Sequence, residues 1–454
     1  MQDKTSIHGA WTSRWIFILA ATGSAVGLGN IWKFPYITGE NGGGAFVLVY
    51  LCCILLVGVP IMMAEVLVGR RGRQSPINAM KDVALEAGRS RYWSLVGWIG
   101  VLAGFMIFSF YSVVAGWVLY YIAGMGVGDF IAIGSDDANG VFNDLLANPQ
   151  TLIIWHSIFV MMVMLVIVGG VKKGLENAVK FLMPALFVLL LVMLAYSSQT
   201  EGFAAGWDFL FHYDPSELTA ESVLVALGHS FFTLSLGMGA IMAYGSYMPK
   251  KTSIGSAVIW IAIMDTLVAL IAGLVIFPIV FTNGMDPGKG PGLMFVTLPV
   301  AFGQMPGGQI FGFVFFLLVG VAAWTSAISL MEPATAWLVE KFNWHRVPAC
   351  IVLGLIVWGL GVAALGSFNF ISDVKLAGFS IFDFLDFVTA NIMLPLGGLC
   401  IAIFVGWIIT RKMAANELAI SSPLLFNAWY IALRFIAPVG VLVIFIFSLV
   451  EKFK

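Results

Sequence analysis

Charged side chains are scarce in this sequence of 454 residues. Asp, Glu, Lys and Arg make up 10 % of it, and the formal net charge is −1. A nearly neutral chain lacks the basic patch that a nucleic-acid partner requires. Cysteine is also scarce. Cys52, Cys53, Cys350 and Cys400 lie in apolar runs without paired spacing, so we expect neither disulfides nor a cysteine metal site.

Apolar residues dominate instead, at 60 % of the chain, which predicts a polytopic helical membrane protein. A helix needs about 20 apolar residues to cross a bilayer, and this length divides the chain into about eleven spans. The predicted spans are 15–37, 43–69, 91–125, 151–170, 174–197, 221–248, 254–283, 307–340, 346–365, 379–410 and 424–450. Residues 1–14 are polar and carry no cleavable signal pattern, so the first run is interpreted as a span.

Basic residues gather in alternate loops between these runs. They are Arg70, Arg71, Arg73, Lys172, Lys173, Lys250, Lys251, Lys341, Arg346, Arg411 and Lys412. The other loops are acidic or neutral, as around Asp136 and Glu217. Because basic loops stay on the cytoplasmic side, we predict a multi-pass protein of the cell membrane with a cytoplasmic N-terminus. The odd number of spans then places the C-terminus outside.

The first run contains the glycine-rich stretch 23–30, Gly-Ser-Ala-Val-Gly-Leu-Gly-Asn. Each glycine weakens a helix by about 1 kcal/mol relative to alanine. Non-helical backbone at membrane depth must line a cavity or contact other protein, because lipid offers no hydrogen bonds. Its free carbonyls can then bind a cation and its free amides an anion. Close helix packing through Gly23 and Gly27 is the alternative interpretation.

The sixth run has the same kind of interruption. Residues 231–239, Phe-Phe-Thr-Leu-Ser-Leu-Gly-Met-Gly, place hydroxyls and glycines at mid-membrane. Two interrupted spans, five apart, predict an internal repeat within a single transporter domain, 1–454. The first repeat would be 15–197, the second 221–410, and 424–450 an extra span. Paired broken helices in corresponding positions indicate the central site of a secondary transporter.

Two other segments are unusual. Residues 284–308 are rich in Gly and Pro, and their apolar middle, 294–302, predicts short helices that dip back as an outer lid. On the cytoplasmic side, Gly174 and Pro184 predict a local weak point, because proline removes a helical hydrogen bond. An ordinary kinked helix is the alternative there.

Polar residues within the spans are costly and therefore informative. Glu65, Asp265, Asn30 and the pair Thr325–Ser326 stand out. A carboxylate, an amide, hydroxyls and free carbonyls form an oxygen-only set, which suits a hard cation such as sodium. For each hydroxyl, the alternative is a bond to its own helix. For Asp265, the alternative is a satisfied buried carboxylate.

Five motifs spread over most of the chain carry a family resemblance. They are GSAVGLGNIWKFPY at 23–36, ENGGGAFVLVY at 40–50, PIMMAEVLVGR at 60–70, SFFTLSLGMGAIMAYGSYM at 230–248 and TSAISLMEP at 325–333. The chain resembles bacterial neurotransmitter:sodium symporters, in particular the type that transports several hydrophobic amino acids. The resemblance implies an all-α polytopic membrane protein with the LeuT fold, a five-plus-five inverted repeat and broken spans 1 and 6.

The resemblance also implies two sodium ions. Ligands of the first would be the Ala25 carbonyl, Asn30, Thr233, Asp265 and the substrate carboxylate, which would couple the two binding events. Ligands of the second would be the carbonyls of Gly23, Val26 and Ala322 and the hydroxyls of Thr325 and Ser326. The second ion would clamp the first span to the eighth.

The implied substrate is a hydrophobic L-amino acid such as Leu or Trp. Its carboxylate would meet the amides of Leu28 and Gly29, at the positive end of a half-helix, and the Tyr111 hydroxyl. Its ammonium would meet carbonyls of Ala25, Phe231 and Thr233, with Ser235 nearby, and its side-chain pocket would be Val114, Phe231, Phe232, Met238, Ser326 and Leu330. Flexible Met238, between two glycines, would let the pocket re-pack around different side chains.

The resemblance assigns gates on both sides of this site. Lys33 and Asp386 would form the outer charged gate, beneath which Phe232 and Tyr111 form a lid. The inner gate would join His8, at a position that is usually basic, to Tyr247 and Glu340. Glu65 is assigned to a supporting shell that binds the frayed backbone near the breaks.

Asp265 departs from many animal members of the family, which need chloride and carry a neutral Asn at this position. A fixed carboxylate can offset the charge of a buried sodium ion, so we expect uptake without chloride. Protonation of Asp265 on the empty return step, giving proton antiport, is a further hypothesis.

Together these features predict a symporter in the lipid bilayer that imports aliphatic and aromatic L-amino acids with sodium by alternating access. No Ser/His/Asp grouping, metal-ligand cluster or phosphate loop occurs at membrane depth in the sequence, so an enzyme is not expected. The alternatives are a sodium-dependent amino-acid sensor and a channel-like protein without coupled uptake. The chain could act alone or as a homodimer.

Overall fold

The computed structural model describes residues 6–287 and 292–452, and the regular elements among these residues are all helices. Nine of the described helices are long and apolar enough to cross a membrane, and a helix pair bent by 52° makes a tenth span. At the sixth predicted position the chain forms two shorter helices, α11 (Ala220–Thr233) and α12 (Ala240–Ser246). The predicted all-helical, polytopic architecture is therefore confirmed.

The first five spans follow one another from the N-terminus. They are α1 (Arg14–Ala25) with η1 (Gly29–Lys33) and α2 (Phe34–Glu40); α3 (Gly44–Cys53), η2 (Ile54–Gly58) and α4 (Val59–Gly72); α6 (Ser94–Val127); α8 (Pro149–Val168); and η4 (Gly170–Glu176) with α9 (Asn177–Ser197).

The later spans begin with α11 and α12. They continue with α13 (Ile254–Thr282); α15 (Gly308–Phe342); α16 (Arg346–Gly366); α17 (Ile381–Phe387), η7 (Val388–Met393), α18 (Leu394–Ile403) and η8 (Phe404–Ile408); and α20 (Pro423–Ile431), η9 (Ala432–Ile436) and α21 (Ala437–Lys452).

Short polar residues begin several of these helices. Ser13 before α1, Asn148 before α8 and Ser253 before α13 each accept a hydrogen bond from the backbone N–H three residues later. Such caps satisfy a free N–H group at the start of a helix. They explain why the helices begin within a few residues of the predicted span boundaries.

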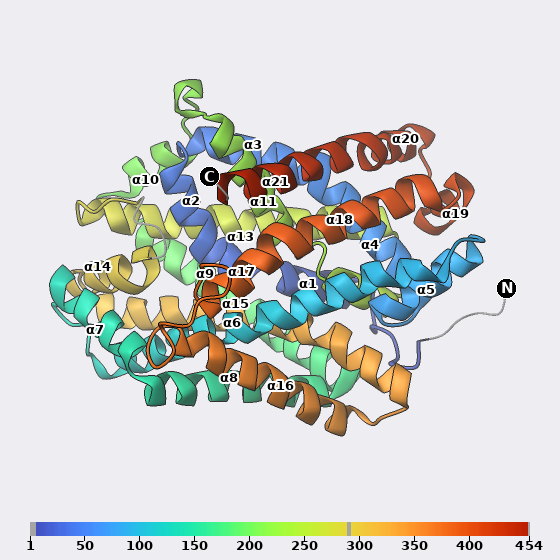
Figure 1. Ribbon diagram of the computed structural model, residues 1–454. Coiled ribbons are helices and arrows are strands. Elements are labelled where there is room, and N and C mark those ends of the chain that lie inside the picture. Colours follow the sequence, from blue (N-terminus) through green and yellow to red (C-terminus); the bar gives the residue numbers. More distant parts are fainter. Residues whose placement is uncertain (1–5, 288–291, 453–454) are drawn as a thin grey trace.

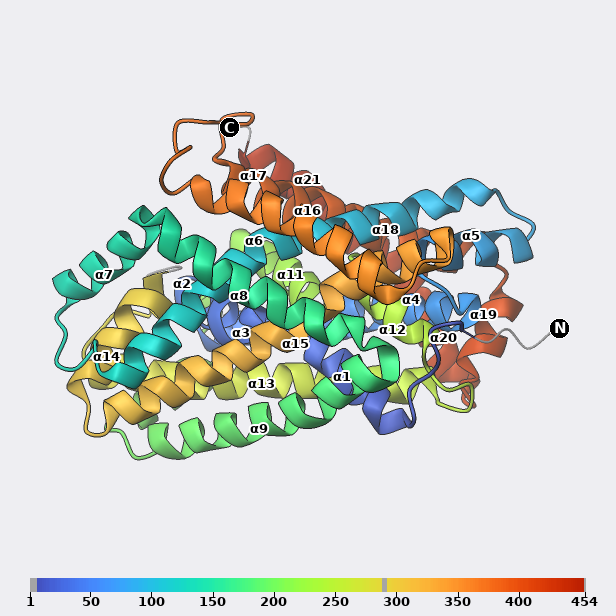
Figure 2. The same ribbon diagram turned by 90° about the horizontal axis from the view of Figure 1, so that it is seen from below.

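The spans lie side by side around two central helices (Figure 1). α6 packs against α15, and the apolar window of the span that contains α6 is 83 % buried, against 22 % for the last span. On the face seen in Figure 2, α8 and α16 cover this pair. The last span is therefore peripheral. The N-terminus lies at one end of the bundle, and the C-terminus lies towards the other end.

Short helices occupy the two ends of the bundle. They are α5 (Pro76–Glu86), η3 (Arg91–Trp93), α7 (Ser135–Ala147), α10 (Phe203–Phe211), η5 (Pro215–Glu217), η6 (Leu293–Thr297), α14 (Leu298–Gln304) and α19 (Arg411–Leu418). The continuous helix of η6 and α14 matches the short helices that were predicted in 284–308. Residues 288–291 of that segment lie outside the described residues.

The segment around Gly174 departs from α-helical geometry before it reaches Pro184. η4 is a π-helix that begins at Gly170, which has a φ of 68°. Gly174 lies so close to the Val166 carbonyl that a Cβ atom would overlap it. Beyond η4, α9 is α-helical through Pro184. The departure from α-helical geometry therefore precedes the proline instead of following it.

Candidate functional site

The first span breaks where the glycine-rich stretch was predicted to break it. α1 ends at Ala25, and Val26 is extended, with a ψ of 111°. The chain becomes helical again at Gly29 and bends by 52° across the gap. Because Val26 leaves the helix, its carbonyl points out of the helical hydrogen-bond ladder and is free to bind another group.

The second break lies between α11 and α12. Ser235, Gly237 and Gly239 all have positive φ, at 53°, 78° and 75°. The N–H of Gly237 donates to Oε1 of Glu65, at 2.7 Å, and Glu65 is fully buried. A carboxylate that accepts from free backbone N–H groups stabilises an unwound segment. Glu65 thus occupies the supporting place predicted for it.

The Ser24 carbonyl joins the two breaks. It accepts hydrogen bonds from Ser235 at 2.8 Å and from Ser326 of α15 at 3.0 Å. The hydroxyl of Ser24 donates to Ser329, also of α15, at 2.7 Å. One residue in the first break therefore holds the second break and α15 together, and the sequence reasoning missed this role.

Asn30, Thr233 and Asp265 come together behind the first break, and all three are fully buried. Nδ2 of Asn30 donates to Oδ1 of Asp265 at 2.7 Å and to Oγ1 of Thr233 at 3.0 Å. The Thr233 hydroxyl also lies 3.1 Å from Oδ2 of Asp265. Among the described residues, no lysine, arginine or histidine forms an ion pair with Asp265. The cluster is therefore an oxygen-rich site with a carboxylate that has no cationic side chain beside it.

Asn30 presents its amide nitrogen to this cluster and its oxygen to the N–H of Gly27, at 3.1 Å. A cation would need the oxygen on the opposite side, which a half-turn of the amide provides. The two orientations occupy the same space, so the side chain can serve either partner.

The residues predicted to hold a second ion lie where α1 meets α15. Thr325 donates to the Ala322 carbonyl at 3.0 Å, and Ser326 donates to the Ser24 carbonyl. A Cβ atom on Gly23 would lie 3.3 Å from that of Thr325, so the two backbones approach closely. This junction gathers the Ser24 and Ala322 carbonyls and the Thr325 and Ser326 hydroxyls from two helices.

A central cavity of about 20 Å³ lies between the two breaks, α6 and α15. It is lined by Ala25, Gly27, Leu28, Gly29, Ile107, Tyr111, Phe232, Ser235, Met238, Ser326 and Leu330. The Leu28 N–H points to the Tyr111 hydroxyl at 3.4 Å. A cavity of this size holds about one or two water molecules, so flexible lining residues must move to admit a larger ligand.

Most of the predicted substrate residues line this cavity, but Val114, Phe231 and Thr233 do not. The ring of Phe231 packs directly against Gly398 of α18 and faces an outer pocket. Thr233 faces the Asp265 cluster. Ile107 and Gly27 line the cavity and were not predicted.

The outer charged pair is not formed. Lys33 and Asp386 share no ion pair among the described residues; the Lys33 ammonium lies instead over the Phe232 ring, 4.8 Å from its centre. A cation over an aromatic face is attracted by the ring quadrupole. The predicted lid residue Phe232 therefore links the Lys33 side chain to the cavity wall.

The residues predicted to form the inner gate lie in a dense polar network. Nε2 of His8 lies 3.0 Å from Oε1 of Glu340, and the His8 ring packs edge-on against Tyr247, with 5.9 Å between the ring centres. The Tyr247 hydroxyl donates to Glu332 at 2.7 Å. Glu332 also receives both ends of the Arg346 guanidinium, at 2.6 and 2.8 Å. This buried pair is bidentate, so it combines two charge-assisted hydrogen bonds.

The sequence reasoning missed Glu332 and Arg346 as partners. Glu332 lies in a long apolar run, and the cost of a carboxylate at that position was the signal that could have found it. Glu176 was also missed, in a segment that contains Lys172, Lys173 and Lys180. It accepts from both the N–H and the hydroxyl of Thr12, at 3.1 and 2.6 Å, and so fixes the start of α1 to η4.

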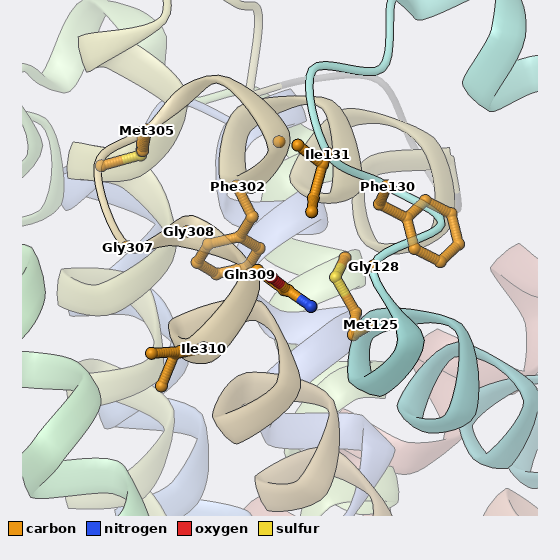
Figure 3. Close-up of a pocket in the computed structure, with 11 residues that line it drawn as sticks. Met125, Gly128, Phe130, Ile131, Phe302, Met305, Gly307, Gly308, Gln309 and Ile310 are labelled. Carbon is orange, nitrogen blue, oxygen red and sulfur yellow. The ribbon is translucent and has the colours of Figure 1, made fainter.

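A separate pocket lies at the other end of the bundle, between the end of α6 and the turn from α14 to α15 (Figure 3). It has a volume of about 240 Å³, and Met125, Phe130, Phe302 and Gln309 surround it. None of the predicted site residues lines it. It is separate from the central cavity.

Known proteins match almost the whole chain. The model of the sodium:neurotransmitter symporter family matches residues 8–125 and 146–454. The chain is 38 % identical to the sodium-dependent transporter YhdH of Bacillus subtilis, over 96 % of each chain. It is 35 % identical to a sodium-dependent transporter of Haemophilus influenzae, over 99 % of this chain and 100 % of that relative. A crystal structure of MhsT in complex with L-phenylalanine matches at a TM-score of 0.89 and 43 % identity, over 97 % of this chain and 99 % of MhsT.

The broken spans and the central site between them define an integral membrane transporter. The chain belongs to the sodium:neurotransmitter symporter family, as the motifs predicted. It is a sodium-coupled transporter with the LeuT fold, and its relatives are transporters and not enzymes.

Proposed function

We propose that this protein imports hydrophobic L-amino acids, both aliphatic and aromatic, together with sodium by alternating access. One observation carries the proposal. Asp265 is fully buried and has no cationic side chain beside it, yet it faces only oxygen-bearing and amide groups next to the central cavity. A buried carboxylate is costly unless a cation accompanies it. Sodium with an amino-acid substrate supplies that cation.

Two sodium ions fit the oxygen groups at the breaks. The first would use Ala25, Asn30, Thr233 and Asp265 together with the substrate carboxylate. The second would use Gly23, Val26, Ala322, Thr325 and Ser326, where α1 meets α15. Because the first site is incomplete without substrate, binding of one favours the other. The second ion would keep α1 against α15 until it leaves.

The lining of the cavity supports the substrate class. Ile107, Met238 and Leu330 are apolar, whereas Leu28 and Tyr111 place an N–H and a hydroxyl at one end. An amino acid would therefore direct its carboxylate to Leu28, Gly29 and Tyr111 and its side chain to the apolar wall. Phe232 and the flexible Met238 would move to admit large side chains. Phe231 and Val114 would join the pocket as it expands.

The topology and the gates complete the proposal. The N-terminus would lie in the cytoplasm, so that the network of His8, Glu340, Glu332 and Arg346 closes the inner side of the cell membrane. Lys33 and Asp386 would close the outer side once substrate is bound. The repeats 15–197 and 221–410 would move against each other, with 424–450 outside them.

Uptake into proteoliposomes tests the proposal directly. Labelled Leu and Trp are supplied with external sodium, and chloride is replaced by gluconate. We expect accumulation that collapses when potassium replaces sodium and persists without chloride, because Asp265 supplies the negative charge. Sodium-dependent binding without accumulation would identify a sensor instead, and a substrate-independent sodium current larger than uptake would identify a channel. Accumulation that follows a proton gradient and ignores sodium would make Asp265 a proton carrier.

A further inference from the structure

Arg434 is an arginine within η9 of the last membrane span, which comprises α20, η9 and α21. Charged residues in a span normally face the protein interior and a partner. The last span is the least buried in the described bundle, so Arg434 is in an unusual place.

Within residues 6–287 and 292–452, the guanidinium of Arg434 has no hydrogen-bond acceptor. Its Nε is buried without a hydrogen-bond partner, and Arg434 forms no ion pair with a carboxylate among the described residues. The group instead lies over the Trp407 ring of η8, 4.0 Å from its centre. Stacking holds the guanidinium plane but leaves its N–H donors without an acceptor.

A second arginine lies beside it. Arg411, at the start of α19, is 5.5 Å from the centre of the Tyr430 ring, and Arg434 is 5.9 Å from the same ring. Arg411 donates to Asn427 but likewise has no carboxylate partner within the described chain. Two cations therefore flank one aromatic ring, without a negative charge between them.

The pair lies at the level of a membrane interface. The indole N–H of Trp407 donates to the Arg434 carbonyl at 3.0 Å, so the two residues share one depth. Trp407 is the penultimate residue of its span and is half exposed, which is the place that tryptophan favours at the edge of the hydrocarbon. α19 and α20 lie at the end of the bundle that carries the N-terminus (Figure 1).

We propose that Arg411 and Arg434 bind the headgroup phosphate of an anionic phospholipid in the leaflet on the N-terminal side. The phosphate would accept from both guanidinium groups, for which it has the right charge and geometry. The acyl chains would lie along the apolar outer face of the last span, where Leu424, Ile431 and Phe435 are exposed. A lipid satisfies at once the unpaired donors and the apolar surface next to them.

Native mass spectrometry of the purified protein with added phosphatidylglycerol tests this site. We expect the wild-type protein to retain phosphatidylglycerol in preference to phosphatidylcholine with the same acyl chains. The double variant R411Q/R434Q should bind phosphatidylglycerol about 25-fold more weakly, at a factor of about five for each lost cation near an anionic headgroup. R91Q is the matched control, because Arg91 is also an exposed arginine that lies over a tyrosine ring, at another place on the bundle.

Two further variants keep the test decisive if the double variant does not fold. R411Q leaves the Trp407 stack intact and should weaken binding about fivefold. R411K/R434K keeps both charges and should retain most of the binding. Unchanged binding in R411Q would overturn the proposal, as would equal retention of phosphatidylcholine by the wild type. Displacement of the lipid by millimolar inorganic phosphate would also overturn it, by identifying a site for a free anion.

Discussion

Two fully buried carboxylates, Asp265 and Glu332, show how a single neighbour decides the role of a residue. Glu332 is paired with Arg346 through two short contacts, so its charge is compensated within the protein. Asp265 has an amide and a hydroxyl as its side-chain partners. Under the proposed function, Glu332 would help to hold the inner side closed, whereas Asp265 would need a bound cation to compensate its charge.

Replacement of Asp265 by Asn tests whether this carboxylate compensates the charge of a bound sodium ion. The side chain keeps its shape but loses the charge that would accompany sodium. We expect the KM for sodium to rise by at least about tenfold in chloride-free medium, because a buried ion loses its compensating charge. Initial rates of Leu uptake over a range of sodium concentrations measure this. An unchanged sodium KM in gluconate would show that Asp265 does not compensate the ion.

Replacement of Glu332 by Gln tests whether its pair with Arg346 stabilises the fold. It leaves Arg346 buried without its partner, which typically costs about 3–5 kcal/mol. We expect a clear fall in the thermal unfolding midpoint in detergent. The double variant E332L/R346M, which removes both charges, should recover much of the stability.

The matched control for that measurement is E86Q. Glu86 pairs with Arg71 at 2.6 Å, but its side chain is 29 % exposed. A solvated pair contributes about 0–1 kcal/mol, so this midpoint should hardly move. Equal losses in E332Q and E86Q would mean that the inner network does not stabilise the fold.

At the scale of elements, the two breaks are maintained by different devices. At the first break, α1 ends because Val26 is extended. The last turn of α1 is held by the hydroxyls of Ser235 and Ser326, which both donate to the Ser24 carbonyl. The second is held by positive φ at Ser235, Gly237 and Gly239 and by Glu65 on the Gly237 N–H. Both devices leave backbone groups free at the cavity, where a ligand can use them.

Gly237→Ala is expected to damage the second break. The φ of 78° strains any L side chain, and an added Cβ would overlap the Leu394 carbonyl of α18. Uptake should be lost and the thermal midpoint lowered. In the same span, Gly228 is helical and the nearest atom to an added Cβ lies 3.9 Å away. Gly228→Ala should therefore retain the fold and gain up to about 1 kcal/mol from helix propensity. Normal uptake by Gly237→Ala would show that the break does not need glycine there.

At the scale of the whole molecule, the site exists where separate parts of the bundle meet. The Ser24 carbonyl of α1 accepts from Ser235, between α11 and α12, and from Ser326 of α15. Asp265 of α13 binds Asn30 beyond the first break. A ligand bound at this junction therefore joins elements that are far apart in the chain. Its binding should stabilise the entire bundle and not one helix.

Thermal unfolding in detergent can detect this linkage. Sodium should raise the unfolding midpoint relative to potassium at equal ionic strength. At a sodium concentration 100 times its dissociation constant, the folded state gains up to about 2.7 kcal/mol of free energy. Leucine should add a further rise in sodium but little in potassium, because its carboxylate completes the first ion site. Glutamate, with a charged side chain, is the control that should not add stability. Equal stabilisation by leucine in both salts would separate substrate binding from sodium.

Much of this protein was predictable from its sequence, because the bilayer imposes local rules. A span must satisfy its own backbone groups, so it is helical, and the lengths of the apolar runs predicted where these helices lie. Glycine, threonine and serine at mid-membrane predicted where both breaks lie. The cost of burying Asp265 and Glu65 marked the central site and its supporting carboxylate. The motifs then identified the family.

The tertiary structure decided which residues meet across the fold. Ser24 with Ser235, Glu332 with Tyr247 and Arg434 with Trp407 depend on contacts between separate helices. Packing likewise decides where the Phe231 ring lies, and it places the Lys33 ammonium over Phe232 instead of beside Asp386. Local propensity carries no information about such contacts, because they arise from the positions of whole helices. The sequence by itself determined the spans, the breaks and the residue types near them, whereas the fold determined which of these residues are in contact.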